Sequence, residues 1–172
     1  MEIWDIMNEH GEITGKTAIR GRTSLKPGEY HLVVHIWIMS SKGDFLIQRR
    51  SESRRLMPGE WAATGGSAVS GENSEVAAKR ELYEELGIIG NETNMQFMGR
   101  LKRRNSFLDV WFVTCDEKAE NLKLQESEVA EAKWVSGDIL KKMIHDHLFH
   151  NYGREYFKTI FTYSKVFWEK FQ

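Results

Sequence analysis

The residues best suited to chemistry are three glutamates near the middle of the chain, in a segment whose pattern predicts a helix over 74–86. At about 100° per residue, Glu81, Glu84 and Glu85 fall within one arc of roughly 100° on that helix. Like charges at this spacing destabilise an isolated helix, so a bound cation is the simplest explanation for the cluster. The alternative is a solvated acidic helix face, which three glutamates alone would favour.

Carboxylate ligands favour Mg²⁺, Mn²⁺ or Ca²⁺ over zinc. Because Mg²⁺ binds through a few carboxylates, water and phosphate oxygens of the substrate, the cluster indicates a phosphorylated substrate. A metal bound in this way neutralises a diphosphate and supplies an activated water, while a further carboxylate accepts the proton of that water. Arg80 lies at the edge of the acidic arc, where it can pair with Glu84 or reach back to Glu72. The backbone at Gly65 and Gly66 can approach closely, and a carbonyl there could be another ligand.

The spacing around the glutamates is more specific than the glutamates themselves. Five residues separate Gly66 from Glu72, and seven more separate Glu72 from Arg80. The chain then reads Arg80-Glu81-Leu82-Tyr83-Glu84-Glu85-Leu86-Gly87-Ile88. A match at seven fixed and two aliphatic positions is expected on the order of once in a billion windows of ordinary composition. The spacing therefore favours a functional motif over a solvated acidic face.

This spacing resembles the Nudix box, and every position of that motif is filled here. The resemblance implies an α/β fold, namely an α/β/α sandwich around a mixed β-sheet. It also implies hydrolysis of a diphosphate linkage, with Mg²⁺ (or Mn²⁺) as cofactor, in a nucleoside diphosphate derivative or another small diphosphate compound. The leaving group stays open, with nucleoside triphosphates, nucleotide sugars, dinucleotides, coenzyme A and isoprenoid diphosphates as candidates.

The resemblance assigns roles to individual residues. The implied catalytic residues are Glu81, Glu85 and Arg80. The implied metal ligands are Glu81, Glu84, Glu85, the Gly65 carbonyl and Glu128, and the implied structural supports are Glu72, Gly66 and Gly87. Many Nudix enzymes recruit one more acid from a late loop, where Glu128 is preferred here over Glu126. Glu81 is preferred as general base, a role that varies within the family.

A second resemblance is to isopentenyl-diphosphate isomerase, which shares the Nudix fold. It rests on the segments 30–51 and 58–61, and it implies that Arg50 contacts a diphosphate. The isomerase needs a cysteine where this chain has Gly65 and a metal-binding histidine where it has Ser67. We therefore expect shared ancestry or a shared diphosphate-binding surface without isomerase chemistry. The rival functions are the isomerase reaction and a non-catalytic nucleotide-binding Nudix module.

Interleaved strands and helices are predicted around these residues. A β-hairpin is predicted over Glu2–Met7 and from Ile13 onward. The predicted strands are Tyr30–Ser40, Phe45–Arg49, Trp61–Thr64, Met95–Leu101, Phe107–Thr114 and Ala132–Val135. The predicted helices are Ser74–Leu86, a helix from a Ser136 cap to about His145, and Asn151–Phe171.

The first of these helices has recognisable ends and a predicted apolar side. Asn73 or Ser74 is expected to cap its N-terminus, and Gly87 is expected to end it. Opposite the acidic arc, four residues are expected to pack on a sheet: Val76, Leu82, Tyr83 and Leu86.

Composition limits the number of domains, the kinds of partner and the location that we expect. With 172 residues, 41% of them hydrophobic, one domain is expected over 1–172, with an N-terminal β-hairpin and a C-terminal helix. Lysine and arginine total 24 against 25 acidic residues, so no nucleic-acid partner is expected. The apolar stretch Leu32–Met39 is too short to span a bilayer and no signal peptide is evident, so no membrane partner is expected. A single cysteine, Cys115, fits a cytoplasmic location. Oligomeric state is open, although Nudix proteins are often homodimers.

Some residues outside the box have both a structural and a functional interpretation. An arginine cluster that could hold a distal phosphate or lie in a solvated loop consists of Arg49, Arg50, Arg54 and Arg55. Basic residues expected to protect a hairpin edge rather than bind nucleic acid are Arg100, Lys102, Arg103 and Arg104. His31 and His35 share one side of a buried strand, where a core histidine is favoured over a pocket histidine.

Overall fold

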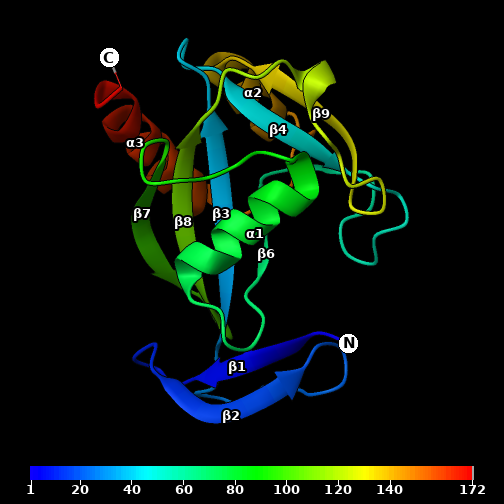
Figure 1. Ribbon diagram of the computed structural model, residues 1–172, viewed down its shortest axis with the longest axis vertical. Coiled ribbons are helices and arrows are strands. Elements are labelled where there is room, and N and C mark those ends of the chain that lie inside the picture. Colours follow the sequence, from blue (N-terminus) through cyan, green and yellow to red (C-terminus); the bar gives the residue numbers. More distant parts are fainter. Residues whose placement is uncertain (172) are drawn as a thin grey trace.

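A mixed β-sheet forms the centre of the molecule (Figure 1), which the computed structural model describes over residues 1–171. Within that range five strands follow the order β5-β4-β3-β8-β7, while β6 pairs with β3 and β9 pairs with β4. The strands are β3 (His31–Met39), β4 (Phe45–Arg50), β5 (Trp61–Ala62), β6 (Thr64–Ser67), β7 (Met95–Lys102), β8 (Ser106–Thr114) and β9 (Val129–Val135). Strands β3 and β8 are parallel, and their neighbours add antiparallel pairings.

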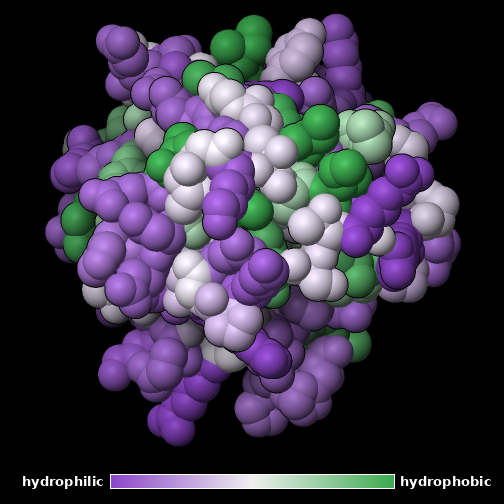
Figure 2. Space-filling view, turned by 90° about the horizontal axis from the view of Figure 1, so that it is seen from below, coloured by the Kyte–Doolittle hydropathy of each residue, from purple (hydrophilic) through white to green (hydrophobic). Residues whose placement is uncertain are grey.

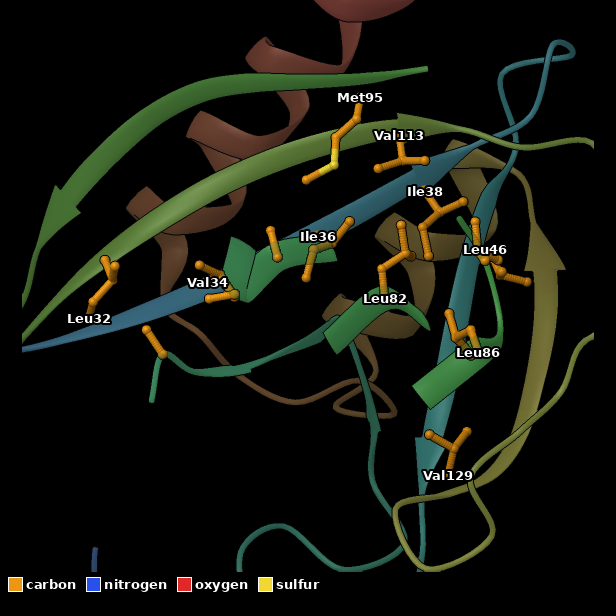
Figure 3. Close-up of a cluster of buried hydrophobic side chains, with 14 of the residues drawn as sticks. Leu32, Val34, Ile36, Ile38, Leu46, Leu82, Leu86, Met95, Val113 and Val129 are labelled. Carbon is orange, nitrogen blue, oxygen red and sulfur yellow. The ribbon is translucent and has the colours of Figure 1, made fainter. Parts of the chain in front are cut away.

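Helices cover both faces of the sheet, so the structure has the predicted α/β/α sandwich. Helix α1 (Ser74–Leu86) lies on one face, and helices α2 (Gly137–His145) and α3 (Arg154–Glu169) lie on the other. Leu82 of α1 belongs to a buried cluster with residues of β3 and β4 (Figure 3). Phe167 of α3 belongs to a second cluster on the opposite face. A short 3₁₀ turn, η1, precedes β9 at Ala119–Asn121.

Strand β3 contributes to both of these cores. Val34, Ile36 and Ile38 face the cluster beneath α1 (Figure 3). Trp37 and Met39, which alternate with them, face the cluster beneath α2 and α3. Since both faces are covered, the strand is a nearly continuous apolar run, as expected for a central strand with a parallel neighbour.

The N-terminal strands form a separate hairpin, β1 (Ile3–Met7) and β2 (Ile13–Ile19), at the lower end of Figure 1. Two backbone hydrogen bonds between Met7 and Tyr30 attach the hairpin to the chain just before β3. Figure 2 views the molecule from below and shows hydrophilic residues over most of that face, with smaller hydrophobic areas among them. The antiparallel pairing of β1 with β2 confirms the predicted hairpin.

Two predicted strand boundaries are wrong. The stretch Trp61–Thr64 is not one strand, because the chain leaves its pairing with β4 after Ala62 and joins β3 from Thr64. Strand β9 begins at Val129 instead of Ala132, since its antiparallel pairing continues along the whole of β4. Both differences arise from pairing between segments that are distant in the sequence.

The predicted ends of α1 are confirmed. Asn73 is the N-cap, and its side-chain oxygen accepts a hydrogen bond of 2.9 Å from the backbone N–H of Val76. Gly87 follows the last turn with φ 71°, a left-handed conformation that favours glycine, and its N–H donates to the carbonyl of Tyr83 at 2.8 Å.

Helix α3 begins later than predicted. Asn151 does not enter the helix, because its side-chain oxygen accepts the N–H of Gly153 at 2.9 Å in a local turn. The helix starts at Arg154. In residues 1–171 no helix is both long and apolar enough to cross a membrane.

The inward face of α1 is rotated from the predicted one. Leu82 and Leu86 are buried as expected, but Tyr83 is 58% exposed and Val76 is 49% exposed. The buried stripe is completed by Ala77, Ala78 and Glu85. Because Glu85 lies near the middle of this stripe, α1 directs a carboxylate toward the sheet rather than only toward solvent.

We expect Leu82→Ala to lower the free energy of unfolding by about 2–5 kcal/mol, because it removes a fully buried side chain and leaves a cavity. Tyr83→Ala is the matched control on the next position, and its effect should stay within about 0.5 kcal/mol, since that ring is mostly exposed. Urea unfolding of both variants measures the difference. Equal losses would contradict the observed orientation of α1.

Candidate active site

Most of the residues predicted from the box gather around one cleft of about 390 Å³. Those that line it are Arg50, Gly65, Gly66, Arg80, Glu81, Glu84, Glu85 and Glu128. Glu72 lies outside the lining, where it contacts Arg80, and Gly87 lies at the end of α1. The cleft therefore joins residues of α1 and β6 to residues from β4 and from the loop before β9.

Arg80 is held by hydrogen bonds to several acidic groups. Its Nε and Nη2 donate to the two carboxylate oxygens of Glu72, at 2.6 Å and 3.0 Å. Its Nη1 donates to Glu81 at 2.9 Å and to Glu84 at 3.1 Å, while Nη2 also reaches the carbonyl of Ser67 at 3.1 Å. Although burial raises the pKa of Glu72, the bonds from Arg80 lower it overall. Arg80 thus uses both predicted partners at once and fixes the carboxylates beside it.

Gly66 allows the carboxylate of Glu81 to lie against the backbone of β6. A Cβ added at position 66 would overlap that carboxylate, so a larger residue would displace it. Only 13% of the Glu81 side chain is exposed. Burial raises the pKa of Glu81, while the charge of Arg80 opposes the rise.

Glu85 is the most deeply buried carboxylate of the cleft, with 3% of the residue exposed. It accepts a hydrogen bond of 2.6 Å from Nε2 of Gln48 on β4. Burial and the nearby charge of Glu81 raise the pKa of Glu85 to about 7, against the smaller effects of Gln48, the Gly65 N–H and Arg50. A carboxylate with one short hydrogen bond and little water around it is well suited to a cationic ligand.

Glu81, Glu84 and Glu85 do not gather at one point in the structure. Among residues 1–171 no group of three or more His, Cys, Asp or Glu side chains is arranged to hold a metal ion. The reason is that Arg80 draws Glu81 and Glu84 to itself, while Gln48 holds Glu85.

The oxygen donors present nevertheless fit a small divalent cation. Mg²⁺ is usually bound by one or two carboxylates together with waters and substrate phosphates, so it needs no ready-made cage of three acids. Glu81 and Glu85 are buried in the same cleft, beside the backbone of Gly65. Zinc prefers cysteine and histidine ligands, whereas the donors that α1 supplies to the cleft are carboxylates.

The late-loop acid, Glu128, lies at the cleft, whereas Glu126 is exposed outside its lining. The loop is tied to the end of α1, because the N–H of Gln125 donates to the carbonyl of Glu85 at 3.1 Å. The side chain of Glu128 forms an ion pair with Arg54. The placement supports the preference for Glu128 over Glu126.

Positively charged residues also line the cleft. Arg50 is 7% exposed, and its Nε donates to the carbonyl of Leu56 at 3.0 Å. Arg103, on the turn between β7 and β8, also lines the cleft. Within the described part of the chain, neither guanidinium has a carboxylate within the 4.0 Å of an ion pair. A buried cation without an acidic partner is well placed for an anionic ligand.

Several cleft residues were not predicted from the sequence. Arg103 was expected to protect a hairpin edge, and His35 was expected in the core, yet both line the cleft. Burial and the charges of Arg103 and His150 lower the pKa of His35 to about 3, so its ring is neutral. Gln48, which bonds Glu85 from outside the lining, is 2% exposed, and the signal for it was an amide directly after the three apolar residues that begin β4. Further lining residues without a sequence signal are Glu2, Arg20, His150 and Tyr152.

Comparison with known proteins agrees with the fold and the cleft. The NUDIX domain family model matches residues 29–153, so the chain belongs to the Nudix family and is a Nudix-type hydrolase. It is 42% identical over 144 residues to an uncharacterised Nudix hydrolase of Listeria monocytogenes, covering 83% of this chain and 85% of the relative.

Solved structures show the same fold. The DR0079 protein of Deinococcus radiodurans has a TM-score of 0.72 and 25% identity, covering 84% of this chain and 90% of that one. The NUDIX domain of Shewanella oneidensis NrtR, crystallised with ADP ribose, has a TM-score of 0.53 and 17% identity, covering 72% of this chain and 82% of that one. At 17% identity the second likeness concerns the fold alone.

Glu85 should make the stability of the metal-free protein depend on pH. Its pKa is about 7 in the folded chain and 4.5 ordinarily, so between these values the folded state binds an extra proton. Stability contributed by this group therefore falls as pH rises, with a slope approaching about 1.4 kcal/mol per pH unit.

Glu85→Gln removes this dependence, so we expect the variant to be more stable than the wild type above pH 7, with the gap closing toward pH 4.5. Urea unfolding in the presence of a chelator, at a series of pH values, measures the gap. A gap that stays constant over this range would show that Glu85 is not a buried carboxylate of raised pKa.

Proposed function

We propose that the protein hydrolyses a diphosphate linkage in a nucleoside diphosphate derivative or another small diphosphate compound, with Mg²⁺ (or Mn²⁺) as cofactor. The observation that carries this proposal is a single cleft that contains the largely buried carboxylates of Glu81 and Glu85 together with two arginines, Arg50 and Arg103, that have no acidic partner among the described residues. A diphosphate together with a divalent cation would satisfy both groups, because the cation would bind the carboxylates and the remaining phosphate charge would pair with the arginines.

The metal would be held by Glu81 and Glu85, with the Gly65 carbonyl, Glu84 and Glu128 as further ligands. When bound, Mg²⁺ neutralises phosphate charge and lowers the pKa of a coordinated water. Glu84 is 48% exposed in its side chain and Glu128 pairs with Arg54, so both must leave their present partners to contribute.

Glu81 is the proposed general base. Its hydrogen bond from Arg80 uses Oε1, so Oε2 can either bind the metal or accept a proton from the attacking water, and while Glu81 acts as general base it would leave the direct metal contact to Glu85. Arg80 orients this carboxylate and, through its paired bonds to Glu72, keeps its own guanidinium in place. Glu85 is the proposed catalytic metal ligand, because its burial leaves the fewest alternative positions for its side chain.

Arg50 and Arg103 would bind the phosphate that departs with the leaving group. Arg50 is already fixed by its bond to the Leu56 carbonyl, so little side-chain freedom is lost when an anion binds. Charge neutralisation at this end stabilises the departing phosphate as the bond to the attacked phosphorus breaks. The ADP ribose bound by the NrtR domain is a nucleoside diphosphate derivative, the class proposed here. We also propose a cytoplasmic location, which the single cysteine, Cys115, supports.

Formation of phosphomonoesters or pyrophosphate from a panel of diphosphate compounds tests the reaction. We expect turnover that requires Mg²⁺ or Mn²⁺, and we expect Glu85→Gln to lower kcat/KM by at least about 100-fold. The panel should contain nucleotide sugars, dinucleotides, nucleoside triphosphates and isoprenoid diphosphates.

Glu126→Gln is the matched control, because it makes the same chemical change on an exposed residue near the cleft, and it should keep wild-type turnover. Turnover that survives in Glu85→Gln, or that needs no divalent cation, would contradict the proposal. An allylic product from an isoprenoid diphosphate would instead indicate the isomerase reaction.

A further inference from the structure

A hydrogen-bond network connects the hydrophobic cluster beneath α2 and α3 with His35 in the lining of the cleft. The indole Nε1 of Trp37 donates to the hydroxyl oxygen of Tyr156 at 3.0 Å. That hydroxyl lies 2.6 Å from Nδ1 of His35. All three residues are buried, at 1%, 6% and 8% exposure, so water has little access to these bonds. The three side chains come from β3 and α3, which meet only in the folded protein.

The positions of the protons in this hydrogen-bond network follow from counting donors and acceptors. An indole N–H can only donate, so the Tyr156 oxygen must accept from Trp37. The remaining hydroxyl proton has His35 Nδ1 as its acceptor, and a proton on Nδ1 would leave this buried hydroxyl proton without a partner. The neutral ring of His35 therefore accepts at Nδ1 and carries its proton on Nε2.

The Nε2 edge of the ring lies beside Gly65, which has no side chain to cover it. Residues 35 and 65 are paired across β3 and β6, and a Cβ at Gly65 would lie 3.0 Å from Cδ2 of His35, the carbon next to Nε2. Among residues 1–171, Nδ1 of His31 is the fully buried side-chain nitrogen or oxygen that lacks a hydrogen-bond partner. The hydrogen bond of the His35 ring uses Nδ1, so Nε2, which has no such bond among these residues, is not fully buried. His35 is also part of the cleft lining.

We propose that His35 is a substrate-binding residue whose Nε2–H donates to a phosphoryl oxygen of the diphosphate, and that Tyr156 and Trp37 are positioning residues that fix its tautomer. The proposal rests on the proposed diphosphate hydrolysis. A phosphoryl oxygen is the acceptor indicated by the surroundings, since Gly65 lies beside the ring and Arg103 lines the same cleft. The fixed N–H would add a directed hydrogen bond to the charge that the arginines supply.

The tautomer is tested directly by ¹⁵N NMR of histidine-labelled protein at neutral pH. We expect His35 to carry its proton on Nε2 in the wild type, and we expect Tyr156→Phe to release this preference. Tyr163→Phe makes the same change on the same helix, away from His35, and should leave the tautomer as it is. A proton on Nδ1 in the wild type would overturn the assignment.

Kinetics test the role in binding. His35→Leu, which removes the donor, should raise KM for the preferred diphosphate about tenfold or more with a smaller change in kcat. His35→Gln keeps an N–H donor at a similar distance from the backbone and should recover much of the loss. Titration with a non-hydrolysable methylene diphosphonate analogue of the same substrate measures affinity without turnover. It should show the tightest binding for the wild type, weaker binding for His35→Gln and the weakest for His35→Leu.

Two failures can be told apart. If the wild type hydrolyses a diphosphate while a folded His35→Leu variant keeps wild-type KM and analogue affinity, the role of His35 is overturned and the proposed function stands. If the wild type neither binds nor hydrolyses any diphosphate in the panel, both are overturned.

Discussion

The burial of Glu81 and Glu85 between α1 and the sheet is the constraint on which the rest of the site depends. Removing neighbouring carboxylates from water costs free energy unless hydrogen bonds or cations compensate for the lost hydration. Arg80 compensates at Glu81, and Gln48 contributes one short bond at Glu85. The raised pKa of Glu85 shows that this compensation is incomplete in the metal-free chain. A divalent cation would supply the missing positive charge.

The same constraint explains features of the surrounding fold. Gly66 must be glycine because the Glu81 carboxylate occupies the space that a side chain at position 66 would need. Glu72 must be acidic because its two carboxylate oxygens accept hydrogen bonds from Arg80. The break between β5 and β6 has a related consequence, since it moves the chain from β4 to β3 and places Gly65 beside His35. Most acidic residues of the cleft thus come from one helix, while the two arginines without acidic partners within residues 1–171 come from β4 and from the turn between β7 and β8.

The helical part of the site could be predicted from the sequence because its geometry depends on local spacing. The limits of α1 and both of its caps follow from residues within one turn of its ends. The partners of Arg80 also lie within reach along the helix and the preceding loop. The α/β/α architecture followed from the family resemblance together with the alternation of strands and helices.

What could not be predicted depends on tertiary contacts. The orientation of Tyr83 was wrong because the buried stripe of α1 contains Glu85, so apolar residues alone did not mark the inward face. The separation of the glutamates could not be foreseen, because Arg80 binds two of them. Arg103 and His35 reach the cleft through strand pairing and helix packing, which spacing in the sequence does not reveal.

The central claim is that the buried carboxylates of α1 hold a divalent cation, and anomalous diffraction from crystals soaked in Mn²⁺ tests it most directly. The account predicts a single strong anomalous peak in the cleft, bound by Glu81 and Glu85 near the Gly65 carbonyl, that is absent in Glu85→Gln. A peak at another position, or no peak in crystals of a protein that turns over substrate with Mn²⁺, would contradict it.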